Sequence, residues 1–188
     1  MHNHFHDLNG EQKEQLLTVT DKRGKRIGIA TRQDCHKGEG KPHLAFMAFV
    51  TDRNGKIILA KRSKNKSLWP GFWDASVVSH VLPGETPREA AKRRGKEELG
   101  AEVDFKDLGA FYYFAKHGSE AENEYCHVLI GKTSQEVYPN NVEIEEIKKI
   151  SLEELKEQIK NNSSGFTPWL KLALTKVNLT EYITSFAE

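Results

Sequence analysis

Residues 80–101 hold the densest group of side chains suited to chemistry. Glu97 and Glu98 follow Arg94 by three and four positions, so on a helix all three share one face. Glu85 adds a carboxylate just before that helix. Carboxylates beside an arginine, reached from a glycine loop, suit a divalent metal and a phosphate chain. The alternative is a solvated, charged helix face with no chemistry.

Two further sets of possible metal ligands lie outside this stretch. His36 and His43 flank a Gly/Pro-rich segment. Glu122 and Glu124 are two residues apart on a predicted strand, which places them on one face. Two carboxylates on one face repel each other unless a cation lies between them. A solvent-facing strand edge and structural histidines are the alternatives.

A basic loop follows a predicted strand. Residues 61–67 include Arg62 and Lys66, and the stretch Leu-Trp-Pro-Gly-Phe-Trp comes directly after them. Lysines and arginines at a strand end can clamp a diphosphate, and arginine does so through two parallel hydrogen bonds. The alternative is a solvated basic turn.

The helix that carries Arg94 has clear start and stop signals. Thr86 is a favourable N-cap, Pro87 occupies the first helical position, and Glu89 completes a capping box. Gly100 stands where a helix favours a left-handed residue. These signals predict a helix over residues 87–99.

Hydrophobic patterns and turn residues predict the remaining elements. Asn54-Gly55 is a hairpin signal between two apolar runs, and a capping box starts at Ser151. On this basis His36 lies on a loop and His43 at a strand entrance. We expect a hairpin over residues 16–31 that turns near 23–24, strands at 44–52, 56–62, 108–116, 122–130 and 142–151, and helices at 152–160 and 167–177, whereas residues beyond 178 give no signal.

Length and composition indicate one globular domain, and the predicted strands and helices make it an α/β domain. The chain has 188 residues, of which 37% are hydrophobic and 29% charged. A net charge of +1 argues against nucleic-acid or membrane-surface partners, and no apolar run reaches the ~20 residues of a membrane span. The two cysteines, Cys35 and Cys126, give no disulfide framework and fit a cytoplasmic location. Residues 1–15, with His2, His4 and His6, are expected to form a flexible tail, and residues 16–188 the domain.

The central stretch resembles the Nudix box, G-x5-E-x7-R-E-U-x-E-E-x-G-U, where U is aliphatic. The matching positions are Glu85, Arg93, Glu97, Glu98 and Gly100, and the departures are Ser79, Arg94 and Gly95. Arg94 replaces a glutamate that is usually a metal ligand in Nudix hydrolases. Paired arginines here are similar to the type 1 isopentenyl diphosphate isomerase branch of that family.

Other motifs carry the resemblance to that branch over about residues 16–174. H-x6-H-L-A-F matches at His36 and His43, R-x3-K followed by W-P-G-x-W matches from Arg62 to Trp73, and E-N-E matches at Glu122 to Glu124. The resemblance implies the Nudix fold, a mixed β-sheet between helices, and a small-molecule diphosphate substrate. It gives no indication of oligomeric state.

The resemblance also implies residue roles. The metal ligands would be His36, His43, His80, Glu122 and Glu124, with Glu98 holding a separate Mg²⁺. The diphosphate would be contacted by Arg32, Arg62, Lys66 and Arg94, and Trp169 would close the hydrocarbon pocket or simply pack in the core. Glu124 and Tyr113 would be catalytic, with Tyr112 as the substitute if the loop is offset. Three imidazoles and two carboxylates suit Mn²⁺, Zn²⁺ or Fe²⁺ better than Mg²⁺.

One departure bears directly on activity. The branch has a catalytic cysteine opposite the proton-transfer carboxylate, where this chain has Val78. A double-bond shift adds one proton and removes another, and valine can do neither. The resemblance still implies a metal-dependent, isopentenyl diphosphate isomerase-like enzyme acting on a prenyl-type diphosphate. The alternatives are a Nudix diphosphohydrolase and a diphosphate-binding protein without turnover.

Overall fold

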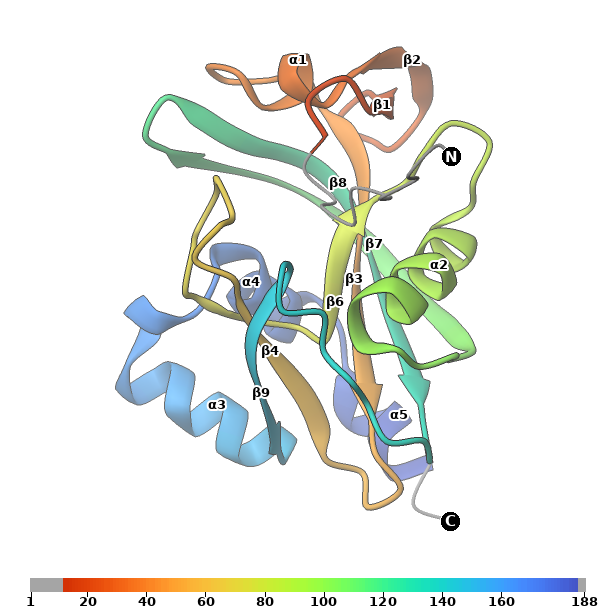
Figure 1. Ribbon diagram of the computed structural model, residues 1–188, viewed down its shortest axis with the longest axis vertical. Coiled ribbons are helices and arrows are strands. Elements are labelled where there is room, and N and C mark those ends of the chain that lie inside the picture. Colours follow the sequence, from red (N-terminus) through yellow and green to blue (C-terminus); the bar gives the residue numbers. More distant parts are fainter. Residues whose placement is uncertain (1–11, 186–188) are drawn as a thin grey trace, which may run out of the picture.

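The computed structural model describes residues 12–185 (Figure 1). The expected tail and its three histidines lie mostly outside the described residues, so the domain boundary at residue 15 stays a prediction. The elements are β1 Leu16–Thr20, β2 Arg26–Thr31, α1 Arg32–His36, β3 His43–Thr51, β4 Ile57–Arg62, β5 Trp73–Asp74, β6 Val77–His80, α2 Pro87–Leu99, β7 Phe105–His117, β8 Glu120–Lys132, β9 Ile144–Ile150, α3 Leu152–Asn161, the 3-10 turn Ser163–Gly165, α4 Pro168–Lys176 and α5 Leu179–Ser185.

Strand β3 is the centre of the sheet. All nine of its residues are buried, as an unbroken apolar run with both faces covered requires. It pairs in parallel with β8 along its whole length and antiparallel with β6. The side chains that alternate from Leu44 to Val50 pack in the cluster that includes α2, whereas those from Ala45 to Phe49 pack in the cluster that includes α3, α4 and α5. The expected mixed sheet between helices is confirmed.

Other strands extend this sheet at both sides. β1 and β2 form the expected hairpin, in which Gly24 adopts a positive φ of 84°. β4 pairs with β5 and with β9. β7 and β8 form a long antiparallel pair that begins earlier and ends later than predicted, because main-chain pairing continues through polar residues and around a bulge near Gly109.

The capping signals give accurate helix bounds. α2 begins after a complete capping box at Thr86 and ends at Gly100, whose φ is 64°. α3 likewise begins at the capping box of Ser151. No sequence pattern predicted α5. None of the described helices combines the length and the apolar character that a membrane crossing requires.

One local prediction is wrong. His36 lies at the end of helix α1 and not on a loop. The hydroxyl of Thr31 caps this helix by accepting a hydrogen bond from the Asp34 N–H at 3.2 Å. A helix of five residues is too short to show a hydrophobic period, so the sequence pattern does not reveal it.

Candidate functional site

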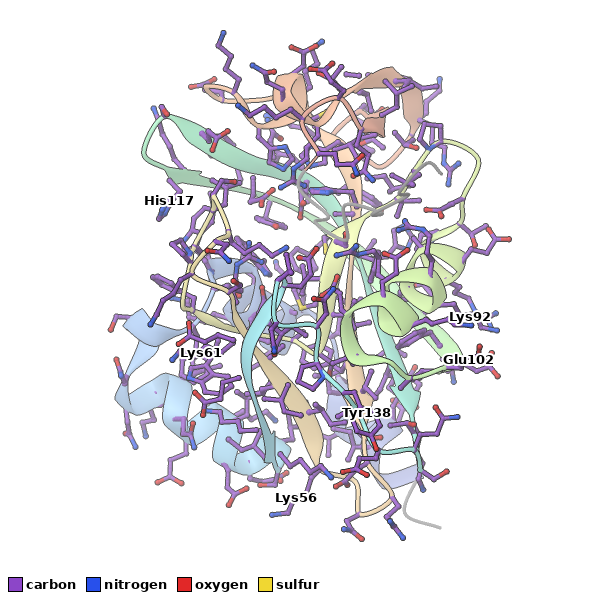
Figure 2. All side chains as sticks on the ribbon, viewed as in Figure 1. Lys56, Lys61, Lys92, Glu102, His117 and Tyr138 are labelled. Carbon is purple, nitrogen blue, oxygen red and sulfur yellow. The ribbon has the colours of Figure 1, made fainter. Side chains whose placement is uncertain are left out.

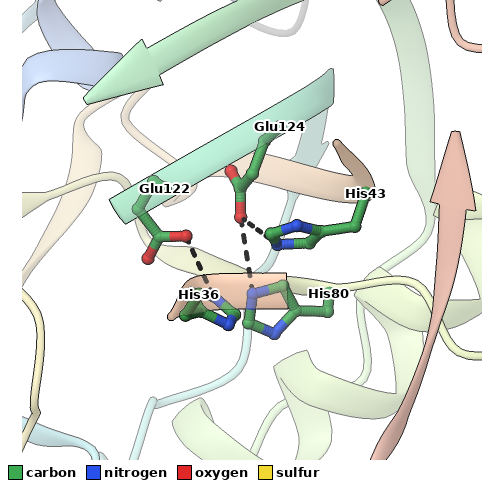
Figure 3. A group of neighbouring side chains, drawn as sticks. All are labelled: His36, His43, His80, Glu122 and Glu124. Carbon is green, nitrogen blue, oxygen red and sulfur yellow. Dashed lines mark ion pairs between the residues drawn. The ribbon is translucent and has the colours of Figure 1, made fainter. Parts of the chain in front are cut away.

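Five buried side chains from four elements converge at one end of β3 (Figure 3). They are His36, His43, His80, Glu122 and Glu124, and each contributes a nitrogen or oxygen atom to a group whose members all lie within 4.8 Å of one another. The three imidazole ring centroids are 4.8–5.0 Å apart. The structure thus brings together the five side chains that the sequence analysis grouped, although they are scattered along the chain.

Strand register produces this convergence. His43 opens β3 and stands directly opposite Glu124 on β8. His80 ends β6 opposite Ala45, two residues further along β3. Glu122 lies on the same face of β8 as Glu124 because side chains alternate along a strand. His36 reaches the group from α1, which contacts β8 through a bridge between Lys37 and Glu120.

Hydrogen bonds orient two of the imidazoles for metal binding. The Nδ1–H of His36 donates to the Arg32 carbonyl at 2.7 Å, and that of His43 donates to the Lys41 carbonyl at 2.8 Å. Their Nε2 atoms therefore carry lone pairs and face Glu122 and Glu124 at 3.0 and 3.4 Å. A backbone carbonyl behind a ligating histidine is the usual way in which proteins fix this tautomer.

His80 is held differently. The Arg32 guanidinium donates to its Nδ1 at 3.0 Å, while its Nε2 lies 3.4 Å from Glu124. Burial, and then the neighbouring Arg32, lowers the pKa of His80 well below its usual value, and burial also lowers the pKa of His43. Both imidazoles are therefore neutral at neutral pH, as metal ligation requires. Because Nδ1 of His80 accepts from Arg32, the proton of this imidazole lies on Nε2 and faces Glu124.

Unsatisfied atoms in this cluster fit a divalent cation. Nε2 of His36, Nε2 of His43 and Oε2 of Glu122 are buried and lack a hydrogen-bond partner. Buried polar atoms are rarely left so, and these three point toward a common centre. A mixed set of imidazole and carboxylate ligands suits Mn²⁺, Fe²⁺ or Zn²⁺ on ligand type.

The two carboxylates differ in their affinity for a proton. Burial and then Glu122 raise the pKa of Glu124 well above its usual value, and the Tyr113 hydroxyl donates a short hydrogen bond to it. Burial opposes ionisation of Glu122 too, but the adjacent His36 lowers its pKa. Tyr113 stands opposite Glu124 in the β7–β8 register, whereas Tyr112 stands opposite Tyr125. The register therefore favours Tyr113 over Tyr112.

The predicted cationic residues line a small cavity together with Glu122, Glu124 and His80. Arg32, Arg62, Lys66 and Arg94 contribute to its wall, as do Tyr113, Trp169 and Val78. Four cations around one cavity favour an anion such as a diphosphate. The cavity thus joins Glu122, Glu124 and His80 of the cluster to four cations, Arg32, Arg62, Lys66 and Arg94, which we call the cationic cradle.

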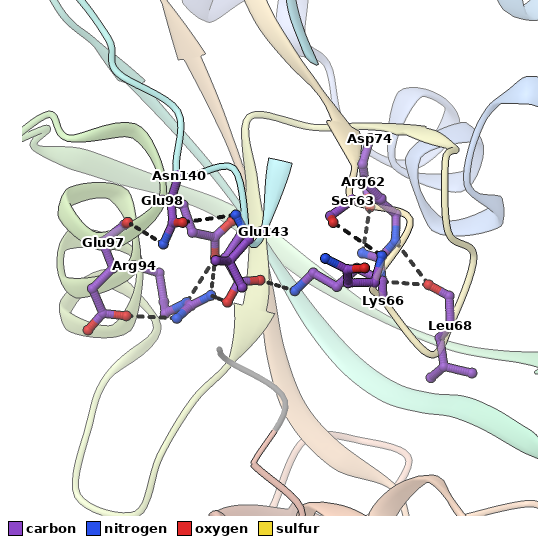
Figure 4. A network of polar contacts seen from close by, with 12 residues as sticks. Arg62, Ser63, Lys66, Leu68, Asp74, Arg94, Glu97, Glu98, Asn140 and Glu143 are labelled. Carbon is purple, nitrogen blue, oxygen red and sulfur yellow. Dashed lines mark hydrogen bonds and ion pairs between the residues drawn. The ribbon is translucent and has the colours of Figure 1, made fainter. Parts of the chain in front are cut away.

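Arg94, one of the cradle residues, contacts three carboxylates (Figure 4). Its guanidinium contacts Glu98 at 2.6 Å, Glu97 at 2.7 Å and Glu143 at 3.1 Å. Burial opposes the charge on Arg94, but Glu98 and Glu143 raise its pKa. Burial also raises the pKa of Glu98. The structure thus places Glu98 against Arg94 and outside the five-residue cluster, and its expected role toward a second Mg²⁺ stays a prediction.

Glu143 was missed by the sequence analysis. Its side chain is fully buried and also contacts Lys66, so it joins two cations of the cradle (Figure 4). The sequence shows it only as one of several glutamates that follow the Tyr-Pro-Asn-Asn turn. Nothing in that run distinguishes the buried member.

The position of the missing cysteine is also clear. Val78 lies on β6 and lines the cavity, as does Ser79. Ser76 points elsewhere: its hydroxyl is buried and accepts from the Val50 N–H at 2.7 Å. Ser76 is therefore a structural residue and does not replace the thiol.

Known proteins resemble this chain in sequence and fold. The model of the NUDIX domain matches residues 41–170. Isopentenyl-diphosphate Delta-isomerase of Brevibacterium linens is 35% identical over 159 residues, which cover 83% of this chain and 87% of that protein. The protein of the same name from Clavibacter michiganensis is 34% identical over 166 residues, with 87% and 86% covered. The crystal structure of DR0079 from Deinococcus radiodurans gives a TM-score of 0.69 at 24% identity, covering 86% of this chain and 98% of that one.

This chain belongs to the Nudix family. Within the family, its relatives place it in the branch of the proteins named isopentenyl-diphosphate Delta-isomerase, as the motifs around His36, Arg62 and Glu122 predicted.

Proposed function

We propose that the protein is a metal-dependent isomerase that converts isopentenyl diphosphate to dimethylallyl diphosphate. The observation that carries this proposal is the convergence of three imidazoles and two carboxylates beside a cavity that four cationic side chains also line. Its relatives in the isomerase branch support the choice of substrate.

In this proposal the five-residue cluster holds Mn²⁺, Zn²⁺ or Fe²⁺. When bound, the cation supplies positive charge that allows two buried carboxylates to lie side by side. Arg32, Arg62, Lys66 and Arg94 bind the diphosphate, with Mg²⁺ at Glu98 as a further counter-charge. Trp169 forms a wall against the hydrocarbon, since its indole is buried at the edge of the cavity.

Glu124 is the proton-transfer group in this proposal. Burial and the neighbouring Glu122 raise the pKa of its carboxyl group, and Tyr113 fixes the orientation of that group. An allylic shift adds the proton of this carboxyl group to one carbon and releases another from a nearby carbon, and the Glu124 carboxylate left by the first transfer, or water, must accept the released proton. Because Val78 provides no second group, we expect slow turnover.

One assay tests the proposal. The purified protein is incubated with isopentenyl diphosphate and Mn²⁺ or Mg²⁺, and dimethylallyl diphosphate is measured. Product that disappears in Glu124→Gln but persists in Glu120→Gln, a variant at the start of the same strand, supports the proposal. An active Glu124→Gln variant would rule out the assigned proton donor.

A Nudix diphosphohydrolase is the second candidate, and Val78 is the observation that favours it. Loss of the thiol removes an isomerase group that hydrolysis does not need. Arg94 argues against it, because this arginine replaces a glutamate that is usually a metal ligand in Nudix hydrolases. Release of phosphate from a panel of nucleoside diphosphates would favour hydrolysis. Binding with neither product would indicate a protein without turnover.

A further inference from the structure

A buried aspartate lies behind the cavity and makes no contact with the metal cluster residues. Asp74 ends the short strand β5 and is 2% exposed. Asp74 lies outside the motifs of the sequence analysis, so no role was predicted for it. Burying a carboxylate is costly unless several donors satisfy it, which makes its partners informative.

The Asp74 carboxylate accepts hydrogen bonds from several surrounding groups. The Trp169 indole N–H lies 2.9 Å from both carboxylate oxygens, and the Thr167 hydroxyl donates at 3.0 Å. The Ala75 N–H donates at 2.8 Å, and the Arg62 guanidinium lies at 3.4 Å. Burial raises the pKa of the Asp74 carboxyl group to about 6, while Arg62 and these hydrogen bonds oppose the rise, so the group is mainly ionised at neutral pH.

Two of these partners, Arg62 and Trp169, line the cavity and belong to different elements. Arg62 comes from the end of β4, and its other nitrogens are fixed by the carbonyls of Leu68 and Trp69. Trp169 comes from the first turn of α4, and its ring lies 5.8 Å from that of Tyr113. Asp74 therefore connects the end of β4, which carries Arg62, with helix α4, which carries Trp169.

We propose that Asp74 is a positioning residue that holds the Arg62 guanidinium and the Trp169 indole in place for one substrate. Arg62 then meets the diphosphate while Trp169 meets the hydrocarbon. The inference rests on the diphosphate binding of the proposed function. It adds a residue that touches no substrate but orients the side chains at both ends of the binding site.

The test compares two buried aspartates in the intact chain. Asp74→Asn removes the charge between Arg62 and Trp169. Asp52→Asn is the matched control, because Asp52 accepts the N–H groups of Asn54 and Lys56 in the turn after β3, at the opposite end of that strand from His43. Affinity for inorganic pyrophosphate with Mg²⁺ is measured by calorimetry, and the Trp169 indole N–H signal is followed by ¹⁵N NMR.

Asp74→Asn is expected to weaken pyrophosphate binding by about tenfold, as the loss of one charge-assisted hydrogen bond would, and to shift the indole signal. Asp52→Asn is expected to lower stability and to leave both readouts unchanged. A folded Asp74→Asn variant with wild-type affinity would overturn the inference. If that variant does not fold, Thr167→Val removes one donor outside the cavity, and unchanged pyrophosphate affinity in it would overturn the inference equally.

The outcomes separate this inference from the proposed function. Wild-type protein that binds pyrophosphate but forms no dimethylallyl diphosphate contradicts isomerase activity. In that case the ratio of the pyrophosphate affinities of wild-type protein and Asp74→Asn still decides the role of Asp74. Wild-type protein that does not bind pyrophosphate contradicts both.

Discussion

Val78 is the single side chain that most directly limits the proposed reaction. It lines the cavity that Glu124 also lines, and its methyl groups neither accept nor release a proton. Val78→Cys should therefore raise the rate of isopentenyl diphosphate isomerisation by about 10²–10⁴-fold, the usual contribution of one general acid-base group. Dimethylallyl diphosphate formation at saturating substrate measures the change.

Val78→Ser is the matched control, because it gives a hydroxyl of similar size whose pKa is unsuited to the transfer. A Cys variant no faster than the Ser variant would show that the cavity does not hold isopentenyl diphosphate in the proposed way.

Arg94 neutralises two buried carboxylates, Glu98 and Glu143, of which Glu143 also contacts Lys66. Glu98 is 5% and Glu143 2% exposed. Arg94→Ala should lower the free energy of unfolding by about 3–5 kcal/mol, the range found when one partner of a buried ion pair is removed. Urea titration measures this. Mg²⁺ should restore part of the lost stability in the variant, because the freed carboxylates become oxygen ligands for a hard cation.

Arg93→Ala is the comparison for this prediction. Arg93 is adjacent in sequence, but its side chain is 29% exposed and pairs with Glu85. Its removal should cost no more than about 1 kcal/mol. Equal losses in the two variants, or no response to Mg²⁺ in Arg94→Ala, would contradict the structural role given to the Arg94 network.

The family resemblance identified the five cluster residues. Spacing alone pointed to the pairs His36/His43 and Glu122/Glu124 and left structural alternatives open, and His80 came only from the family motif. The same reasoning could not find Glu143 or Asp74. Glu143 belongs to a run of glutamates, and only the fold shows that it alone turns inward toward Lys66 and Arg94. Asp74 acquires its importance from Trp169, which lies 95 positions away in the sequence.

At the scale of elements, the loop between α1 and β3 sets the distance between two proposed metal ligands. Gly40 in this loop has a φ of 64°, and a Cβ there would lie 2.1 Å from the Cys35 carbonyl oxygen. That carbonyl accepts the Lys41 N–H at 3.2 Å, and the Lys41 carbonyl in turn holds His43. Gly40→Ala should therefore lower Mn²⁺ affinity by at least about tenfold, because it moves His36 relative to His43.

Gly38→Ala separates this effect from backbone strain alone. Gly38 has a similar φ of 68°, but a Cβ there meets no atom within 4 Å. It should cost about 1–2 kcal/mol of stability, as a left-handed alanine does, with little change in Mn²⁺ affinity by calorimetry. Equal losses of Mn²⁺ affinity in the two variants would contradict the clash at Gly40.

Elements with strong local signals were predicted best. The capping boxes at Thr86 and Ser151 fixed the starts of α2 and α3, since they satisfy backbone N–H groups locally. Helix α1 was missed because tertiary contacts and one cap at Thr31 stabilise it. The extra length of β7 and β8 was missed because their polar ends pair through the main chain, which no side-chain pattern reports.

At the scale of the whole molecule, the proposed metal centre joins four elements that are far apart in the sequence. Its ligands come from α1, β3, β6 and β8, which are separated by as much as 88 positions in sequence between His36 and Glu124. A cation bound only by the folded chain must therefore stabilise the entire domain. At a concentration 100 times the dissociation constant, the gain is about 2.7 kcal/mol.

Thermal unfolding makes this prediction quantitative. For a chain of this size, each kcal/mol raises the melting temperature by about 2–4 °C, so Mn²⁺ should raise it by about 5–11 °C and EDTA should reverse the rise. His43→Gln should abolish the response, because His43 is fully buried and presents Nε2 to the centre of the cluster. His127→Gln should retain it, since His127 is partly exposed and pairs with Asp107 on the far part of the β7–β8 pair. A rise that persists in His43→Gln would place the cation elsewhere, and the absence of any rise in wild-type protein would show that the five side chains do not form a metal site.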